Sequence, residues 1–299
     1  MTNAHSVKTR LKNQAMEDGS TMQDKLTAFA LERTVYRISI SKYADRFTLK
    51  GGIFMYALFD GNFARATMDI DLLAQKISAD AERMKEVFLD IFSIEEDDAI
   101  CYDTDSLEVK NITEFKKYHG VNISVMAYLD RTRVPVSIDI GFDDVIYPER
   151  MKMEFPVLLD MPAPVVYAYS ISSVIAEKFE AIVSLGYANS RYKDFYDIYA
   201  LAAKYTLNGA ELQRSIIETF LHRQTGFHDI VAFEDDFSMD QVRQKRWTAF
   251  IKKKKAMLDI SLDEAVKLLK NFLGPVTDSI RAGETFNAVW NADEQIWKQ

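Results

Sequence analysis

The sequence predicts an α+β protein in which a mixed-sheet half is followed by a helical half. Runs that alternate between aliphatic and polar residues fill much of 106–142, a pattern typical of β-strands. From about residue 166 onward, apolar residues recur at helical spacing instead. The 299 residues suffice for two ordinary domains. We therefore expect an α/β domain with an N-terminal helix over 1–165 and a helical-bundle domain over 166–299.

The first half mixes helical and strand-like runs. Residues 1–20 are polar and predict a frayed start or a loosely docked helix. Apolar residues at helical spacing predict a helix over 22–43 and another over 79–93. Strands are predicted for RFTLKG, MDIDLLA, SLEVKNITEFKKY, GVNISVMAYL and VPVSIDIGF, and a short helix for IFMYALF.

The second half contains five runs with helical periodicity. The first is opened by a serine cap and stopped by Gly186. The five predicted helices are SISSVIAEKFEAIVSLG, SRYKDFYDIYALAAKY, GAELQRSIIETFLHRQ, SMDQVRQKRWTAFIKKKKAM and SLDEAVKLLKNFLGPV.

Composition excludes several classes of protein. Cys101 is the single cysteine, so a disulfide framework within the chain is excluded. No apolar run approaches the roughly 20 residues that cross a bilayer, and the N-terminal residues lack an apolar signal core, so we expect a cytoplasmic protein without a membrane contact. The net charge of −8 argues against an unspecific nucleic-acid coater but allows a local basic patch.

Two carboxylates and two glycines suggest a phosphate chemistry. Asp69 and Asp71 are two apart in a strand-like run, so they share one face of the strand. Carboxylates this close repel unless a cation lies between them, and Mg²⁺ prefers oxygen ligands. Gly51 and Gly52 precede a short helix, where backbone N–H groups can approach a phosphate. Either motif alone favours an exposed strand and a simple turn; together they favour a metal–triphosphate site.

A third carboxylate strengthens this interpretation. Asp139 lies in another strand-like run between Ile138 and Ile140, and two-metal phosphoryl transfer uses a ligand near the attacking hydroxyl. Asp143 and Asp144 follow Gly141 and are better explained as loop acids, although one of them could substitute.

At this point the residues resemble a known family. The runs LKGG…RATMDIDL, VSIDIGFDD and AEKFEAIVSLGYANSRYKDFYDIYAL are similar to those of the AbiEii/AbiGii toxins, which belong to the DNA polymerase β-like nucleotidyltransferase superfamily. The resemblance covers about residues 21–201. It implies a nucleotidyltransferase fold and a toxin of a type IV toxin–antitoxin or abortive phage infection system.

The resemblance also implies a role for individual residues. Asp69, Asp71 and Asp139 would bind two Mg²⁺ ions, with Asp139 as a possible activator of the acceptor hydroxyl. Lys178 matches the lysine of the third motif and Asp194 the aspartate of the fourth. The residues implied in binding the NTP are Gly51, Gly52, Arg65, Thr67, Lys178 and Arg191.

On the pattern alone, several of these residues have simpler explanations. Lys178 lies off the apolar stripe of its helix and would be a surface lysine paired with Glu177 or Glu180. Asp194 and Asp197 share a helix face and could belong to a salt-bridged helix start. The basic run RQKRWTAFIKKKKAM would ordinarily be a solvated helix face, yet it is the best candidate for positioning a nucleic-acid acceptor.

The implied reaction transfers NMP from an NTP to an acceptor hydroxyl, plausibly a tRNA 3′ end, and blocks growth. A cognate antitoxin encoded nearby is the expected partner. Two alternatives stay open: nucleotide transfer to a protein or small-molecule hydroxyl, and a non-catalytic binding protein on the same scaffold. A metal-dependent nuclease would also use carboxylates but has no need of Gly51 and Gly52.

Overall fold

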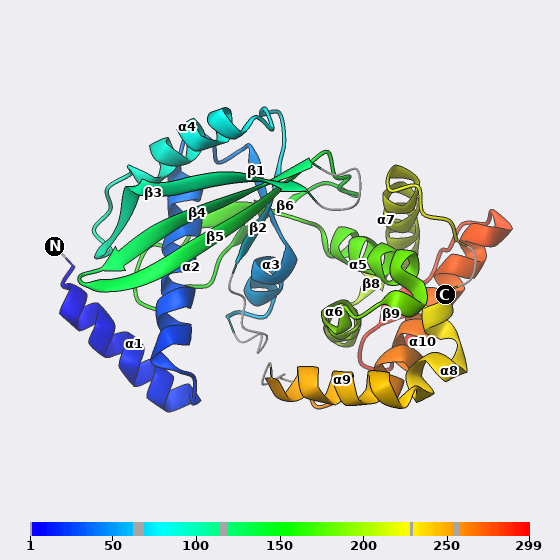
Figure 1. Ribbon diagram of the computed structural model, residues 1–299. Helices are drawn as coiled ribbons and strands as arrows, with labels where there is room; N and C mark the ends of the chain where they lie inside the picture. Colours follow the sequence, from blue (N-terminus) through cyan, green and yellow to red (C-terminus); the bar gives the residue numbers. More distant parts are fainter. Residues whose placement is uncertain (1, 62–68, 114–118, 228–229, 254–257) are drawn as a thin grey trace. The chain divides into compact units, whose positions relative to one another are not determined.

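The first part of the chain contains both strands and helices, whereas helices dominate the second (Figure 1). This computed structural model describes residues 2–61, 69–113, 119–227, 230–253 and 258–299. The described chain divides into two compact units, one of Met1–Asp143 with Met151–Ala168 and one of Asp144–Arg150 with Tyr169–Gln299. The predicted α+β class is confirmed.

The first unit combines a mixed sheet with four described helices. Its elements are α1 (Ala4–Asp18), α2 (Met22–Ile40), β1 (Phe47–Lys50), α3 (Gly51–Leu58), β2 (Ile70–Ala74), α4 (Ala81–Phe92), β3 (Ile100–Thr113), β4 (His119–Leu129), β5 (Thr132–Phe142), β6 (Met151–Glu154) and β7 (Val165–Ala168). The seven described strands lie in the order β3-β4-β5-β2-β1-β7-β6. Strands β2 and β5 run parallel, as do β1 and β7, and the other neighbours are antiparallel.

The sheet has one apolar face and one mixed face. Along β5 the residues Val134, Val136, Ile138 and Ile140 are buried, and the residues between them are exposed or half-buried. This alternation follows from the two-residue period of a strand. The buried face is covered in part by α2, which packs against β5 and β7.

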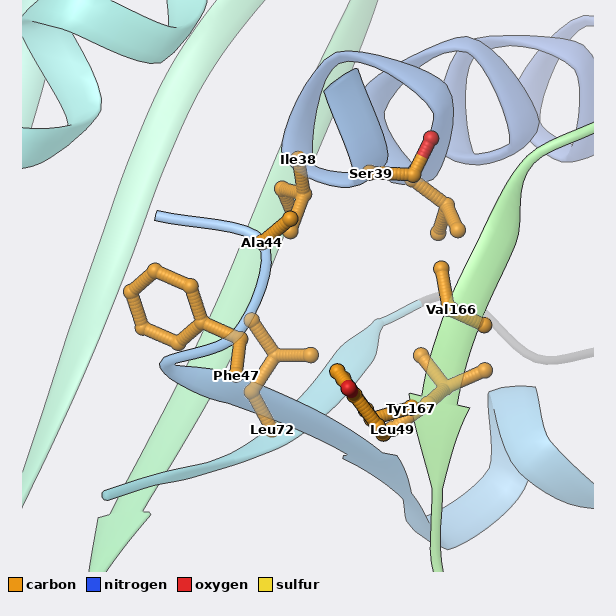
Figure 2. A pocket seen from close by; sticks show the side chains of 9 residues that line it. Ile38, Ser39, Ala44, Phe47, Leu49, Leu72, Val166 and Tyr167 are labelled. Carbon is orange, nitrogen blue, oxygen red and sulfur yellow. The ribbon is translucent and has the colours of Figure 1, made fainter. Parts of the chain in front are cut away.

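A small cavity confirms which way the central strands face. Val35 and Ile38 of α2 line it together with Leu49 of β1 and Leu72 of β2 (Figure 2). Its volume is about 10 Å³, close to the lower limit for a single water, so it is a packing defect rather than a ligand site. Since Leu49 and Leu72 point toward α2, their neighbours Lys50 and Asp71 point to the opposite face.

The N-terminal helix is better anchored than the sequence predicts. Helix α1 buries Val7, Leu11 and Ala15, which are 1%, 0% and 5% exposed, and packs against α2. These residues are four apart and form one narrow stripe. The prediction of a frayed or loosely docked start was wrong because three apolar residues suffice when a neighbouring helix covers them.

The second unit is built around five longer helices. Its elements are α5 (Ile171–Leu185), α6 (Tyr192–Lys204), β8 (Leu207–Asn208), α7 (Gly209–His222), α8 (Asp235–Met239), α9 (Gln241–Lys253), α10 (Leu262–Ala282), β9 (Val289–Asn291) and β10 (Ile296–Lys298). Strands β8, β9 and β10 form a small sheet that the sequence analysis did not predict. Trp290 of β9 is fully buried and donates its indole N–H to the Ala202 carbonyl at 2.7 Å. No helix in the described part of the chain is long and apolar enough to cross a membrane.

Candidate active site

Four polar side chains form a row across the mixed face of the sheet. Asn122 of β4 pairs in register with Asp139 of β5, which pairs with Asp71 of β2, which pairs with Lys50 of β1. Side chains that are directly opposite on neighbouring strands project from the same face. Asp71 and Asp139, separated by 68 positions in the chain, therefore stand side by side on the sheet.

Asp71 is held against the start of α3. The backbone N–H of Gly52 donates to Asp71 Oδ2 at 3.1 Å. Gly51 has φ +63°, and a Cβ on it would lie 2.0 Å from the same oxygen. The carboxylate thus occupies a helix N-terminus, where N–H groups and the helix dipole favour a negative charge. Glycine at Gly51 is needed both for its backbone conformation and for the space that Asp71 fills.

Asp139 is oriented by an amide from the neighbouring strand. Asn122 Nδ2 donates to Asp139 Oδ1 at 2.7 Å and to Ser137 Oγ at 2.9 Å. Asn122 therefore fixes the carboxylate rotamer, as hydrogen-bonded groups around metal ligands commonly do.

Asp69 lies one residue before β2 and is exposed, and the intervening Ile70 is fully buried. Asp69 therefore lies at the N-terminal end of the strand that carries Asp71. Arg65 and Thr67, which the resemblance implies in nucleotide binding, lie outside the described residues.

The donor set of the row suits a hard divalent cation. Asp71 and Asp139 offer carboxylate oxygens from adjacent strands, and each is held by a hydrogen-bond donor, which matches the oxygen ligands of Mg²⁺. Within the described residues, no three His, Cys, Asp or Glu side chains already converge as a closed metal cage. Mg²⁺ commonly binds through one or two carboxylates and retains waters and substrate phosphates, so the two register-paired carboxylates fit it, and the three-ligand site stays a prediction.

A second cluster of charges lies inside the second unit. Lys178 of α5 is 9% exposed and its Nζ lies 3.2 Å from Asp194 Oδ1 and 2.6 Å from Asp197 Oδ2. Arg191 Nε lies 2.7 Å from Asp194 Oδ2. The alternative of a surface lysine paired with its neighbours on α5 was therefore wrong. Asp197, which the sequence analysis placed on the same helix face as Asp194, is a full member of the cluster.

The electrostatics of this cluster favour an ionised Asp194. Burial alone would raise the pKa of this carboxyl, but the Lys178 ammonium and the Arg191 guanidinium outweigh it, and the pKa is lowered. The carboxylate accepts hydrogen bonds from both cations through different oxygens. Lys178 is thus held in one position by two buried acids rather than being a mobile surface charge.

The acids beside Lys178 have a separate partner that the sequence analysis missed. Arg223 lies 3.2 Å from Glu177 Oε1, 3.0 Å from Glu180 Oε2 and 3.1 Å from Asp144 Oδ1. Burial would lower the pKa of Arg223, but the three surrounding carboxylates raise it by more than burial lowers it. The pKa of Arg223 is therefore raised. Glu177 and Glu180 form ion pairs with Arg223, and Lys178 forms its ion pairs with Asp194 and Asp197 instead. Only the tertiary fold could identify Arg223, which lies 43 residues from Glu180.

Comparison with known proteins identifies similar sequences and structures. The family model for the nucleotidyl transferase AbiEii toxin of type IV toxin–antitoxin systems matches residues 33–268. No curated protein sequence matches the chain. A Helicobacter pylori protein that is proposed to be a nucleotidyltransferase is 12% identical, with a TM-score of 0.48, over 86% of this chain and 96% of its own. JHP933 from Helicobacter pylori is also 12% identical, with a TM-score of 0.44, over 88% of this chain and 98% of its own.

Proposed function

Because the chain belongs to the AbiEii nucleotidyltransferase toxin family of type IV toxin–antitoxin systems, we propose that it transfers a nucleoside monophosphate from an NTP to an acceptor hydroxyl. The observation that supports the chemistry best is the register pairing of Asp71 with Asp139 beside the Gly51–Gly52 helix start. The acceptor oxygen forms a bond to the α-phosphorus of the NTP. The bond between the α-phosphorus and the oxygen that bridges it to the β-phosphorus breaks, and pyrophosphate leaves with the electron pair.

Each carboxylate has a proposed role in this step. Asp69, Asp71 and Asp139 would hold up to two Mg²⁺ ions, which when bound supply positive charge for the phosphates. Asp139, oriented by Asn122, would accept the proton of the acceptor hydroxyl. The N–H of Gly52 already serves Asp71, so the remaining N–H groups in the first turn of α3 would meet the triphosphate.

Cationic side chains would offset the charge of the NTP. We propose this role for Lys178, which resembles the lysine of the family's third motif, with Arg191 in support; Asp194 pairs with both of them. Lys50, which the sequence analysis did not single out, is the cation in register with Asp71. We propose that it balances the two carboxylates of the row while no NTP is bound.

The proposed acceptor is the 3′ end of a tRNA or another RNA, and the proposed outcome is growth arrest relieved by a cognate antitoxin. The family supports a toxin with an antitoxin partner.

A labelling experiment tests the reaction and separates it from its alternatives. Purified protein is incubated with each α-labelled NTP, Mg²⁺ and total RNA, and 3′ ends are sequenced. We expect wild type to lengthen a subset of RNAs and Asp71→Asn to lose that activity. Asp105→Asn is the matched control, because Asp105 is an exposed acid of β3 in the same unit.

The other possible products contradict parts of this proposal. Label in protein or in a small molecule would mean that this molecule, and not RNA, is the acceptor. Shortened RNA would indicate a nuclease. No product with any NTP would favour a binding protein. Extension that persists in Asp71→Asn would overturn the assignment of that carboxylate.

A further inference from the structure

Helix α9 has an unusual charge composition for this chain. Among the described helices, it alone carries basic residues and no acidic ones. Its 13 residues, QVRQKRWTAFIKK, include five Lys or Arg, whereas the whole chain has a net charge of −8. Because α9 contains no acidic residue, none of its cations can form an ion pair within the helix.

Several exposed cations on other helices are paired within one turn. Arg83 pairs with Glu86 on α4, Arg214 with Glu218 on α7, and Lys267 with Asp263 on α10. On α9, by contrast, Lys245, Arg246 and Lys252 are exposed, and none of the three has an ion pair among the residues that the structure describes. Their positive charge is therefore available to an external anion.

The opposite side of α9 is fixed to the second unit. Arg243 donates to the carbonyls of Tyr187 and Asn189, and its guanidinium lies 4.2 Å from the ring centroid of Phe237. Trp247 is 2% exposed and donates its indole N–H to the Ile260 carbonyl at 2.7 Å. These contacts hold the helix rigidly in one orientation.

Two of the available cations lie on the side of this fixed helix that faces away from Trp247, and the third lies between that side and the buried one. Lys245 and Lys252 are seven residues apart, which is two turns or about 10 Å along the axis, so they share the same side. Arg246 lies about 100° around the helix from Lys245, and the buried Trp247 lies about 200° around it. We define Lys245, Arg246 and Lys252 as the α9 basic strip.

We propose that the α9 basic strip binds the sugar–phosphate backbone of RNA without selecting among base sequences, an inference that rests on the proposed RNA acceptor. Lys245 and Lys252, about 10 Å apart along the axis, and Arg246 beside Lys245 can contact separate phosphates of one strand. Phosphate contacts position a nucleic acid without reading its sequence. The aromatic residues between the basic ones cannot stack on bases. Trp247 is buried, and Phe250 packs against Trp247 and Tyr196 with ring centroids 5.8 and 6.0 Å apart.

Fluorescence anisotropy on the full chain tests this strip directly. The probes are labelled single-stranded RNAs of about 20 nucleotides, long enough to exceed common single-strand binding sites, one of uridines and one of mixed sequence, titrated without NTP from low to high salt. Three phosphate contacts on a single strand contribute a slope of about −2 to log K against log salt. The variant Lys245→Gln/Arg246→Gln/Lys252→Gln should flatten the slope by about 2 and weaken binding on the order of 100-fold at 0.1 M salt.

A control with the same change in net charge separates the strip from the overall charge. Arg214→Gln/Lys267→Gln/Lys298→Gln removes three paired, exposed cations of the second unit, and binding should stay within about twofold of wild type. The three tryptophans of the chain all lie in this unit, so tryptophan fluorescence checks that both triple variants are folded.

The other possible outcomes would contradict the proposal or a part of it. Equal losses in both triple variants, or none in the strip variant, would overturn the proposal. A strong preference for one RNA sequence would overturn backbone-only recognition, and loss of antitoxin binding with RNA affinity unchanged would assign the strip to an acidic protein surface. RNA binding is measured without NTP, so it is independent of the transfer reaction. Wild type that binds RNA through the strip but extends none would contradict the proposed reaction and leave the RNA-binding proposal intact.

Discussion

Gly51 and Asp71 lie so close together that a single carbon added to Gly51 would be 2.0 Å from the Asp71 carboxylate. The sequence suggests phosphate binding as the reason for the glycine pair. The structure adds a second reason, which is that the first glycine makes room for a candidate metal ligand. The N–H of the second glycine then holds that ligand in place.

Gly51→Ala should therefore disrupt the candidate site from within. A left-handed backbone costs a non-glycine residue about 1–2 kcal/mol, and overpacking adds roughly 1–3 kcal/mol. We expect a lower melting temperature and loss of NMP transfer, measured by calorimetry and by the labelling assay. Gly274→Ala is the control, because nothing lies within 4 Å of its added carbon and alanine favours the helix by about 1 kcal/mol. Unchanged transfer in Gly51→Ala would show that Asp71 can move without consequence.

Asn122 should matter for activity more than for folding. Replacing it with leucine removes the 2.7 Å hydrogen bond to Asp139, and loss of such a bond typically lowers metal affinity or activity 10- to 100-fold. We expect a raised Mg²⁺ requirement in the transfer assay, with a far-UV spectrum like that of wild type. Ser137→Ala is the matched control, since it removes the other acceptor of the same amide but keeps the bond to Asp139. The two variants behaving alike would argue against a positioning role.

The parts of this site that the sequence predicted are those set by local periodicity. Ile70 and Ile138 alternate with acids, and that alone places Asp71 and Asp139 on the mixed face of their strands. What periodicity could not provide is register. The row from Asn122 to Lys50 exists because β2 lies between β5 and β1, an order that the chain does not follow in sequence.

The same distinction explains what was missed in the second unit. The helices were predicted because each has an apolar stripe. The short strands β9 and β10 were not, since they are three residues each and depend on Trp290 and Trp297 docking through distant backbone carbonyls. Nor could the sequence show that Glu177 and Glu180 belong to Arg223 rather than to Lys178.

Loss of Lys178 should first destabilise the second unit. Lys178→Met leaves two acids that are 1% and 0% exposed without their shared cation, and breaking a buried ion pair on one side costs about 3–5 kcal/mol. Tryptophan fluorescence in urea should show this loss. A drop in transfer by this variant alone would therefore not identify a phosphate contact.

A double variant separates the two roles of Lys178. Lys178→Met/Asp197→Leu removes both partners of the 2.6 Å pair, and apolar replacement of a buried pair is often neutral or stabilising. We expect it to recover much of the stability and to stay inactive, because the proposed role of Lys178 is to offset phosphate charge. Recovered transfer would instead mean that the lysine only supports the fold.

Stability of the first unit should fall as pH rises, because of Glu32 on α2. Burial raises the pKa of Glu32 to about 7 from 4.5, although Arg33 and the Leu158 N–H partly oppose it. An acid with a raised folded-state pKa contributes stability that is fully present below pH 4.5 and is lost as pH rises through about 7. The full difference is about 3 kcal/mol. Glu32→Gln imitates the protonated acid and keeps an oxygen for the Leu158 N–H, which donates at 2.6 Å in wild type.

The two proteins should therefore be equally stable at pH 4.5, and Glu32→Gln should be the more stable by about 3 kcal/mol at pH 8. Since the tryptophans lie in the other unit, hydrogen exchange of α2 amides is the appropriate measurement. Glu17→Gln serves as the control, because Glu17 is an exposed acid of α1 in the same unit. A constant difference between wild type and Glu32→Gln across this pH range would show that Glu32 does not titrate within it, and that Arg33 keeps it ionised in the folded protein.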